Sequence, residues 1–114
     1  MKRYIKSSSD TSKSLEEYVG LPFDLSDDEV MWRVSEWTVE QFMEAIQKSK
    51  RYKKREIWVD DVSWNSNRIY FAVMEGPDQK IGEFNARLNW YDVDSDEYED
   101  VEYLIKDTIK DWVN

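Results

Sequence analysis

The segment Lys80–Tyr91 alternates apolar and polar residues, and this alternation restricts the fold more than any other feature of the sequence. At period two, one side of the segment carries Phe84, Ala86, Leu88 and Trp90. The other side carries Glu83, Asn85, Arg87, Asn89 and Tyr91. A strand with one apolar and one mainly polar side belongs to an antiparallel sheet that is covered on one face. The pattern therefore predicts such a sheet with helices packed on it.

Two further strand-like runs, Ile57–Trp64 and Arg68–Met74, come before this segment. The polar turn at 65–67 predicts that they form a hairpin, and the turn Gly76–Gln79 leads into the third strand. Asp60 and Asp61 interrupt the alternation of the first run as a β-bulge would. The residues Lys2–Lys6 are suited to a fourth, short strand.

Helical periodicity occurs on both sides of the strand region. The segment Thr38–Tyr52 is predicted to be a helix, because apolar residues recur at the spacing of one helical face. They are Val39, Phe42, Met43 and Ile46. A second helix is predicted from Asp96 to Val113, and its apolar stripe consists of Tyr98, Val101, Leu104, Ile105, Thr108 and Trp112. A shorter helix is predicted at Ser14–Val19, ended by Gly20.

The segment Val30–Trp37 fits two structures. Val30, Val34 and Trp37 lie on one face of a helix, whereas Val30, Trp32 and Val34 alternate as in a strand. Ser26–Glu29 has the form of a capping box, which would begin a helix here. We favour a strand over Val30–Ser35, because Thr38 and Gln41 resemble the start of a new helix.

Together these elements predict an α+β fold. It consists of a meander of three antiparallel strands, or four with the N-terminal one, and its helices pack on one face. The core order is helix–strand–strand–strand–helix. We expect residues 1–114 to form a single domain with a flexible segment at about 7–14, which is rich in serine.

Composition excludes several kinds of chemistry. The chain has no Cys and no His, so it has no disulfide, no thiol nucleophile, no Ser–His dyad and no zinc–thiolate site. No apolar run is long enough to cross a membrane, and no hydrophobic segment of a secretory signal follows the N-terminus. We therefore expect a cytoplasmic protein that has no cofactor and is not an enzyme.

The charges are unevenly distributed within a net charge of −9. Six cations form what we call the basic island: Lys48, Lys50, Arg51, Lys53, Lys54 and Arg55. The island is either a charged helix end with its exit loop or a contact with a partner, and the sequence does not decide between them. The rest of the molecule is strongly anionic, which argues against direct binding of nucleic acid or membranes.

The opposite charge gathers near the C-terminus. We call this set the acidic face, and its members are Asp94, Asp96, Glu97, Tyr98, Glu99, Asp100, Glu102, Tyr103 and Asp107. Acids in the first turn of a helix are favoured by the helix dipole, which accounts for Asp96, Glu97 and Glu99. The dipole explains neither Asp94 nor Tyr103, an aromatic residue on the side opposite the apolar stripe. The pattern indicates a surface that binds a basic partner, in which carboxylates stand in for phosphates.

Two families share the order of elements. The order helix–three strands–helix resembles that of double-stranded-RNA-binding domains, but acids stand at Asp96–Asp100 where that family has phosphate-binding lysines. The same order, followed by Glu97-Tyr98-Glu99-Asp100, resembles small phage-encoded inhibitors of CRISPR nucleases that mimic DNA. This resemblance implies a partner with a basic nucleic-acid-binding site, with a CRISPR nuclease as the first guess, in the cytoplasm of the phage's host.

The sequence also suggests three other interpretations. The first is that the surface belongs to a small accessory or immunity-type interaction module, for which exposed Trp32 or Trp37 beside Asp27–Glu29 would form a second acidic-aromatic patch. A Mg²⁺-dependent nuclease would use Asp78 and Lys80 with Asp60 or Asp61. The alternating acids from Asp92 onward resemble the start of a calcium loop, but Glu97 and Tyr103 replace its essential Gly and Glu. We therefore expect no metal site.

Overall fold

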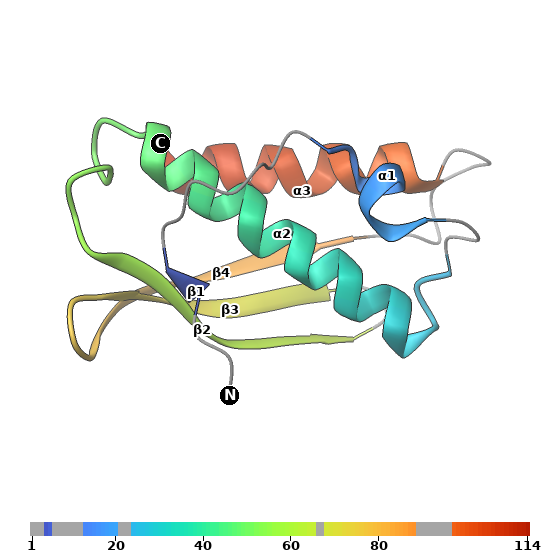
Figure 1. Cartoon of the computed structure of the whole chain (residues 1–114), viewed down its shortest axis with the longest axis horizontal. Coiled ribbons are helices and arrows are strands. Elements are labelled where there is room, and N and C mark those ends of the chain that lie inside the picture. Colours follow the sequence, from blue (N-terminus) through green and yellow to red (C-terminus); the bar gives the residue numbers. More distant parts are fainter. Residues whose placement is uncertain (1–3, 6–12, 21–23, 66–67, 89–96) are drawn as a thin grey trace.

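A four-stranded antiparallel sheet and three helices form two layers in the computed structural model (Figure 1). The structure describes residues 4–5, 13–20, 24–65, 68–88 and 97–114, and the side chains of residues 4–5 and 97–100 are not among those described. In chain order the elements are β1 (Tyr4–Ile5), α1 (Leu15–Val19), α2 (Asp28–Lys48), β2 (Ile57–Asn65), β3 (Arg68–Glu75), β4 (Gln79–Arg87) and α3 (Glu97–Val113). The predicted α+β class and element order are confirmed.

The sheet has the order β1-β2-β3-β4, and every neighbouring pair is antiparallel. β2, β3 and β4 form the expected meander, and the two-residue β1 adds the short fourth strand by pairing Tyr4 with Val59. All three helices lie on the same side of the sheet (Figure 1). The predicted bulge is present, because the β2–β3 register shifts between Asp60 and Ser63. Asp61 has a left-handed φ of 54° there.

The start of α2 differs from the structure that the sequence predicts. The segment Val30–Ser35, predicted as a strand, is the first part of a continuous helix that begins at Asp28. Val30 and Val34 are four residues apart, so the same residues satisfy both a strand and a helix pattern. Burial resolves the ambiguity, since Met31 and Val34 are buried while Trp32, between them, is exposed.

The caps of α2 also differ from the prediction. The N-cap is Asp27 rather than Ser26, and its side chain accepts a hydrogen bond from the Glu29 N–H at 2.9 Å. Thr38 does not begin a helix. It is buried in the middle of α2, where its hydroxyl donates to the Val34 carbonyl at 2.8 Å. A threonine can therefore satisfy its hydroxyl inside a helix, and the sequence alone does not distinguish this position from a cap.

Several element ends differ by a few residues. α2 ends at Lys48 rather than near Tyr52, which is buried in the following loop. β4 ends at Arg87, short of the predicted Tyr91, and residues 89–91 lie outside the described residues. Asp96, the predicted start of the last helix, also lies outside them.

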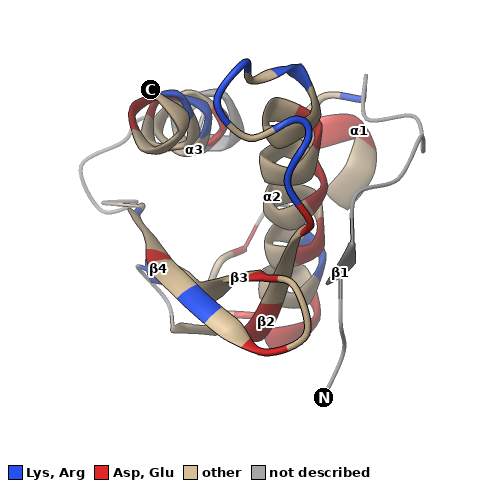
Figure 2. Ribbon diagram, turned by 90° about the vertical axis from the view of Figure 1, so that its left-hand side faces the viewer, with Lys and Arg blue, Asp and Glu red and all other residues tan. Residues whose placement is uncertain are grey.

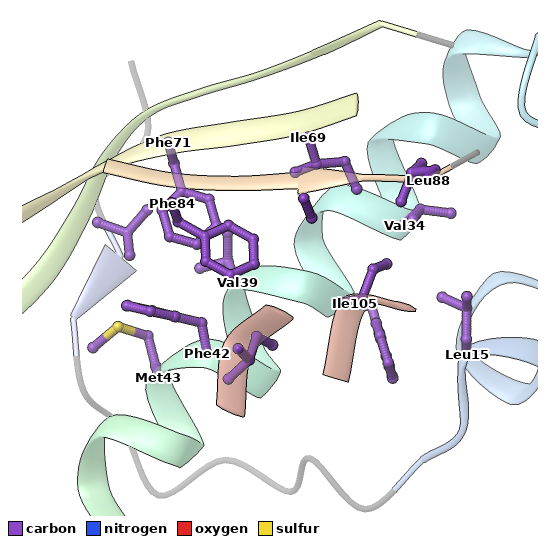
Figure 3. Close-up of a cluster of buried hydrophobic side chains, with 14 of the residues drawn as sticks. Leu15, Val34, Val39, Phe42, Met43, Ile69, Phe71, Phe84, Leu88 and Ile105 are labelled. Atoms are coloured by element: carbon purple, nitrogen blue, oxygen red, sulfur yellow. The ribbon is translucent and has the colours of Figure 1, made fainter. Parts of the chain in front are cut away.

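The core fills the space between the sheet and the helices (Figure 3). Phe42 of α2 lies at its centre, with its ring centroid 5.1 Å from that of Phe71, 5.5 Å from Phe84 and 5.2 Å from Trp112. Phe71 and Phe84 stack across β3 and β4 at 4.6 Å. The aromatic contacts therefore join α2, β3, β4 and α3 into one packed unit.

The tryptophans vary in burial. Trp58 is buried, whereas Trp64 and Trp112 are partly buried against the core. Trp90 lies outside the described residues. Trp37 is also buried, and its indole N–H donates to the Lys13 carbonyl at 3.0 Å.

The N-terminal segment meets the core just before α1. The flexible segment expected at about 7–14 lies outside the described residues up to residue 12. Ser14 is the N-cap of α1, since its hydroxyl oxygen accepts from the Glu17 N–H at 3.3 Å. The predicted short helix is confirmed, and Gly20 follows it with a φ of 82°, a conformation that favours glycine.

Candidate functional site

α3 carries the acidic face and presents two different sides. Val101, Ile105 and Ile109 are buried in the core. Tyr103 is 69% exposed, and Asp107 is exposed one turn further along the helix. The apolar stripe and the solvent side thus follow the 3.6-residue period that the sequence predicted.

The predicted contact residues divide into three groups. Asp94 and Asp96 lie outside the described residues. The next four occupy the first turn of α3, and nothing is described of their side chains: Glu97, Tyr98, Glu99 and Asp100. The side chains of the remaining three, Glu102, Tyr103 and Asp107, are described. Glu99 precedes Tyr103 by one helical turn, so these two positions share a side of the helix.

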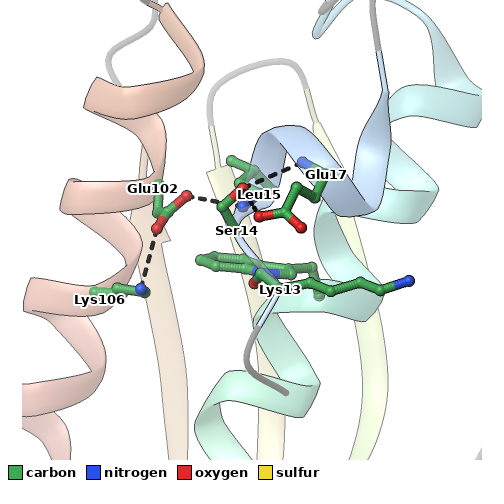
Figure 4. A network of polar contacts seen from close by, with 7 residues as sticks. Lys13, Ser14, Leu15, Glu17, Glu102 and Lys106 are labelled. Atoms are coloured by element: carbon green, nitrogen blue, oxygen red, sulfur yellow. Dashed lines mark hydrogen bonds and ion pairs between the residues drawn. The ribbon is translucent and has the colours of Figure 1, made fainter. Parts of the chain in front are cut away.

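Glu102 makes contacts within the molecule (Figure 4). Its Oε1 accepts a hydrogen bond from the Leu15 N–H at 2.8 Å, and its Oε2 lies 3.0 Å from Lys106 Nζ. Only 20% of the side chain is exposed. The Leu15 N–H belongs to the first turn of α1, where helix N–H groups need an outside acceptor. Glu102 therefore joins α3 to α1, a role that its place in an acidic run did not reveal.

Lysines flank the described half of the acidic face. Lys106 and Lys110 are exposed on α3, so positive and negative side chains alternate along this half. A shallow hollow of about 560 Å³ lies beside Tyr103, and Lys106, Asp107 and Lys110 contribute to its lining. The concentrated negative charge of α3 is thus confined to its N-terminal part, where four of the six residues Glu97–Glu102 are acidic.

A second acidic-aromatic patch lies at the start of α2. Trp32 is 37% exposed and packs against Trp64 of β2, with 5.6 Å between the ring centroids. Asp28 and Glu29 are exposed in the preceding turn. The sequence did not decide whether Trp32 or Trp37 is exposed. Trp32 is the exposed aromatic residue of this patch, and Trp37 is buried.

The basic island is the loop that joins α2 to β2, together with the last residue of α2. Arg55 forms a two-point ion pair with Glu75, with Nε to Oε2 and Nη2 to Oε1 both 2.7 Å. Hydrogen bonding to this guanidinium holds the pKa of Glu75 below its usual value. Lys48 Nζ lies 2.7 Å from Glu44 Oε1, one turn earlier in α2. At least these two cations therefore have structural partners.

The acidic residues considered for a nuclease lie in a turn and at a β-bulge. Asp78 lies in the turn between β3 and β4, and Asp60 and Asp61 lie at the β2 bulge. Within the described ranges, no three acidic side chains lie close enough together to hold a metal ion. None of the helices in those ranges is long and apolar enough to cross a membrane.

Comparison of the chain with protein-family models, with curated proteins and with solved structures found no match.

Proposed function

We propose that the acidic face of α3 binds a basic, nucleic-acid-binding site on a partner protein and blocks it. The observation that carries this proposal is the 69% exposure of Tyr103 on a helix whose opposite side, at Val101 and Ile105, is fully buried. An exposed tyrosine on a fixed helix is the kind of aromatic anchor that is enriched at binding hot spots.

Rigidity supports this role. Packing of Val101 and Ile105 and the hydrogen bond from Leu15 to Glu102 hold α3 against the rest of the fold. Helix neighbours three or four residues apart place their side chains about 6 Å from each other. Glu99 and Asp100 precede Tyr103 by about one turn and Asp107 follows it by one turn, so acidic positions lie on both sides of the exposed ring.

The charge of the partner's cleft would favour such binding. A nucleic-acid-binding cleft holds several Lys and Arg close together, and their mutual repulsion is relieved by counter-charge. Carboxylates on a rigid helix provide that charge without the flexibility of a disordered acidic tail. The sharper form of the proposal is an inhibitor encoded by a phage or mobile element, with a CRISPR nuclease as its first candidate target.

The test uses purified CRISPR nucleases loaded with guide RNA, and it measures how much target DNA they bind in the presence of this protein. We expect the wild type to compete with DNA, and the variant Glu99→Lys/Asp100→Lys to lose this competition while remaining folded. The variant Glu56→Lys/Asp78→Lys is the matched control, because it reverses two exposed acids next to the ends of β2 and β4. Equal competition by both variants would show that the acidic face is not the contact.

A second candidate is an accessory or immunity-type interaction module. The exposed Trp32 packed on Trp64, beside Asp28 and Glu29, favours it. In that case Trp32→Ala would weaken binding of the natural partner more than Glu99→Lys/Asp100→Lys does.

A further inference from the structure

A groove of about 700 Å³ lies where the end of α2 and the loop after it meet the last turns of α3. Its apolar lining comes from Ala45, Ile109 and Val113, all buried or partly buried. Its cationic lining is Lys48, Lys50, Arg51, Lys106 and Lys110. Figure 2 looks onto this end of the molecule, where the blue loop lies close to α3. We call this feature the basic groove.

Three of its cations have no carboxylate partner among the described residues. Lys48 pairs with Glu44 and Lys106 pairs with Glu102. Within the part of the chain that the structure describes, Lys50, Arg51 and Lys110 form no ion pair. The Arg51 guanidinium lies 5.2 Å from the centre of the Tyr52 ring, a contact that leaves its N–H groups able to donate to an anion. The groove lining thus holds five cationic side chains and one acidic side chain, that of Glu44, on a protein of net charge −9.

We propose that the basic groove binds an acidic peptide segment, from a partner protein, that also carries apolar side chains. Carboxylates of the segment pair with Lys50, Arg51 and Lys110. Its apolar side chains cover Ala45 and Val113, which line the same groove. A volume of about 700 Å³ is within the range of sites that hold a small ligand or a few side chains.

Nucleic acid fits the same observations less well. Phosphates would pair with the lysines but would leave the apolar lining without a matching surface. A long nucleic-acid strand would also extend beyond the groove, and the anionic remainder of the protein would repel its phosphates. A short peptide confines its negative charge to the groove.

The basic groove lies at the opposite end of α3 from Glu97–Glu102 (Figure 1). The inference therefore does not depend on the function proposed for the acidic face. If both surfaces are occupied, the protein joins a basic partner and an acidic one, with α3 spanning the distance between them.

The experiment measures fluorescence anisotropy of a labelled peptide rich in glutamate and leucine as the full chain is added. Three probes of equal length accompany it. One has glutamine in place of glutamate, one has serine in place of leucine, and one is single-stranded oligothymidylate. We expect the glutamate–leucine peptide to bind saturably and each of the other probes to bind at least about tenfold more weakly.

The variant Lys50→Glu/Lys110→Glu reverses two exposed groove cations, and we expect it to raise the Kd of the peptide by about tenfold or more. The matched control is Arg68→Glu/Arg87→Glu, which makes the same change in net charge at a pair of facing residues on β3 and β4. Circular dichroism verifies that both variants fold. Absence of peptide binding, equal affinity of the two variants, or oligothymidylate binding as tight as the peptide would each overturn the proposal.

Discussion

The carboxylate of Glu102 on α3 accepts a hydrogen bond of 2.8 Å from the backbone N–H of Leu15, the first residue of α1. The two residues are 87 positions apart in the chain. One side chain therefore satisfies the start of a short helix and fixes the helix that carries the acidic face.

We expect Glu102→Ala to lower the free energy of unfolding by about 1–2 kcal/mol, because the Leu15 N–H and Lys106 both lose their acceptor. Urea denaturation followed by circular dichroism measures the effect. Glu102→Gln is the control, since its amide oxygen can still accept from Leu15 and should retain much of the stability. An Ala variant as stable as the wild type would show that this contact does not hold α1.

Tyr103→Ala should affect binding and not stability. Its side chain is 69% exposed, so we expect the free energy of unfolding to change by less than about 0.5 kcal/mol. At a hot spot, the same change should weaken the affinity for the basic partner by about 2 kcal/mol or more. Tyr70→Ala, at the 37% exposed tyrosine of β3, is the control. Isothermal titration calorimetry measures the affinity of both variants. If both substitutions weaken binding equally and only slightly, Tyr103 is not part of the contact.

Salt should weaken the proposed binding to a basic cleft. The attraction between separated charges decays over a Debye length of about 8 Å at physiological salt. We expect the association rate to fall by about tenfold between low and moderately high salt, with a smaller change in the dissociation rate. Surface plasmon resonance at several salt concentrations measures both rates. An affinity that does not change with salt would favour the interaction module, held mainly by Trp32 and its neighbours.

Phe42→Ala should cost about 3–5 kcal/mol of stability, because the ring is fully buried and contacts Phe71, Phe84 and Trp112. Phe42→Leu keeps much of the volume, so we expect a smaller loss of about 1–2 kcal/mol. Chemical denaturation measures both. Equal losses would mean that the volume kept by leucine contributes little to stability and that the contacts of the aromatic ring are what matters.

The Arg55–Glu75 pair predicts a dependence of stability on pH. The pKa of Glu75 is lowered in the folded protein, so its contribution is present at neutral pH and is lost as the pH falls through that lowered value. Glu75→Gln should therefore reduce Tm at neutral pH and bring it close to the wild type in strong acid. Glu56→Gln, at an exposed carboxylate, controls for the loss of one charge. A constant difference between Glu75→Gln and the wild type at all pH values would contradict this role.

The sequence predicted the sheet and the main helices because their signals are local. The period-two pattern around Phe84 and Ala86 and the bulge at Asp60 both need only neighbouring residues. The start of α2 was predicted wrongly because Val30 and Val34 fit either period, and the packing of Met31 against the core, which the sequence does not show, decides for the helix.

The sequence predicts some features of the candidate site and misses others. The exposure of Tyr103 follows from its position opposite Val101 and Ile105 on one helix. The contact of Glu102 with Leu15 and the meeting of Lys50 with Lys110 in one groove depend on tertiary packing. No spacing along the chain indicates them, and the basic island therefore had two open interpretations.

The orientation of α2 and α3 gives the molecule an electrical polarity. Asp27, Asp28 and Glu29 lie at the beginning of α2, and lysines and arginines follow its end. The first turn of α3 is acidic, and Lys110 is in its last turn. The C-terminal ends of both helices lie at the same end of the 40 Å long axis (Figure 1). A charged body approaching in solution would exert a torque on such a molecule, turning it end-on before any atoms touch.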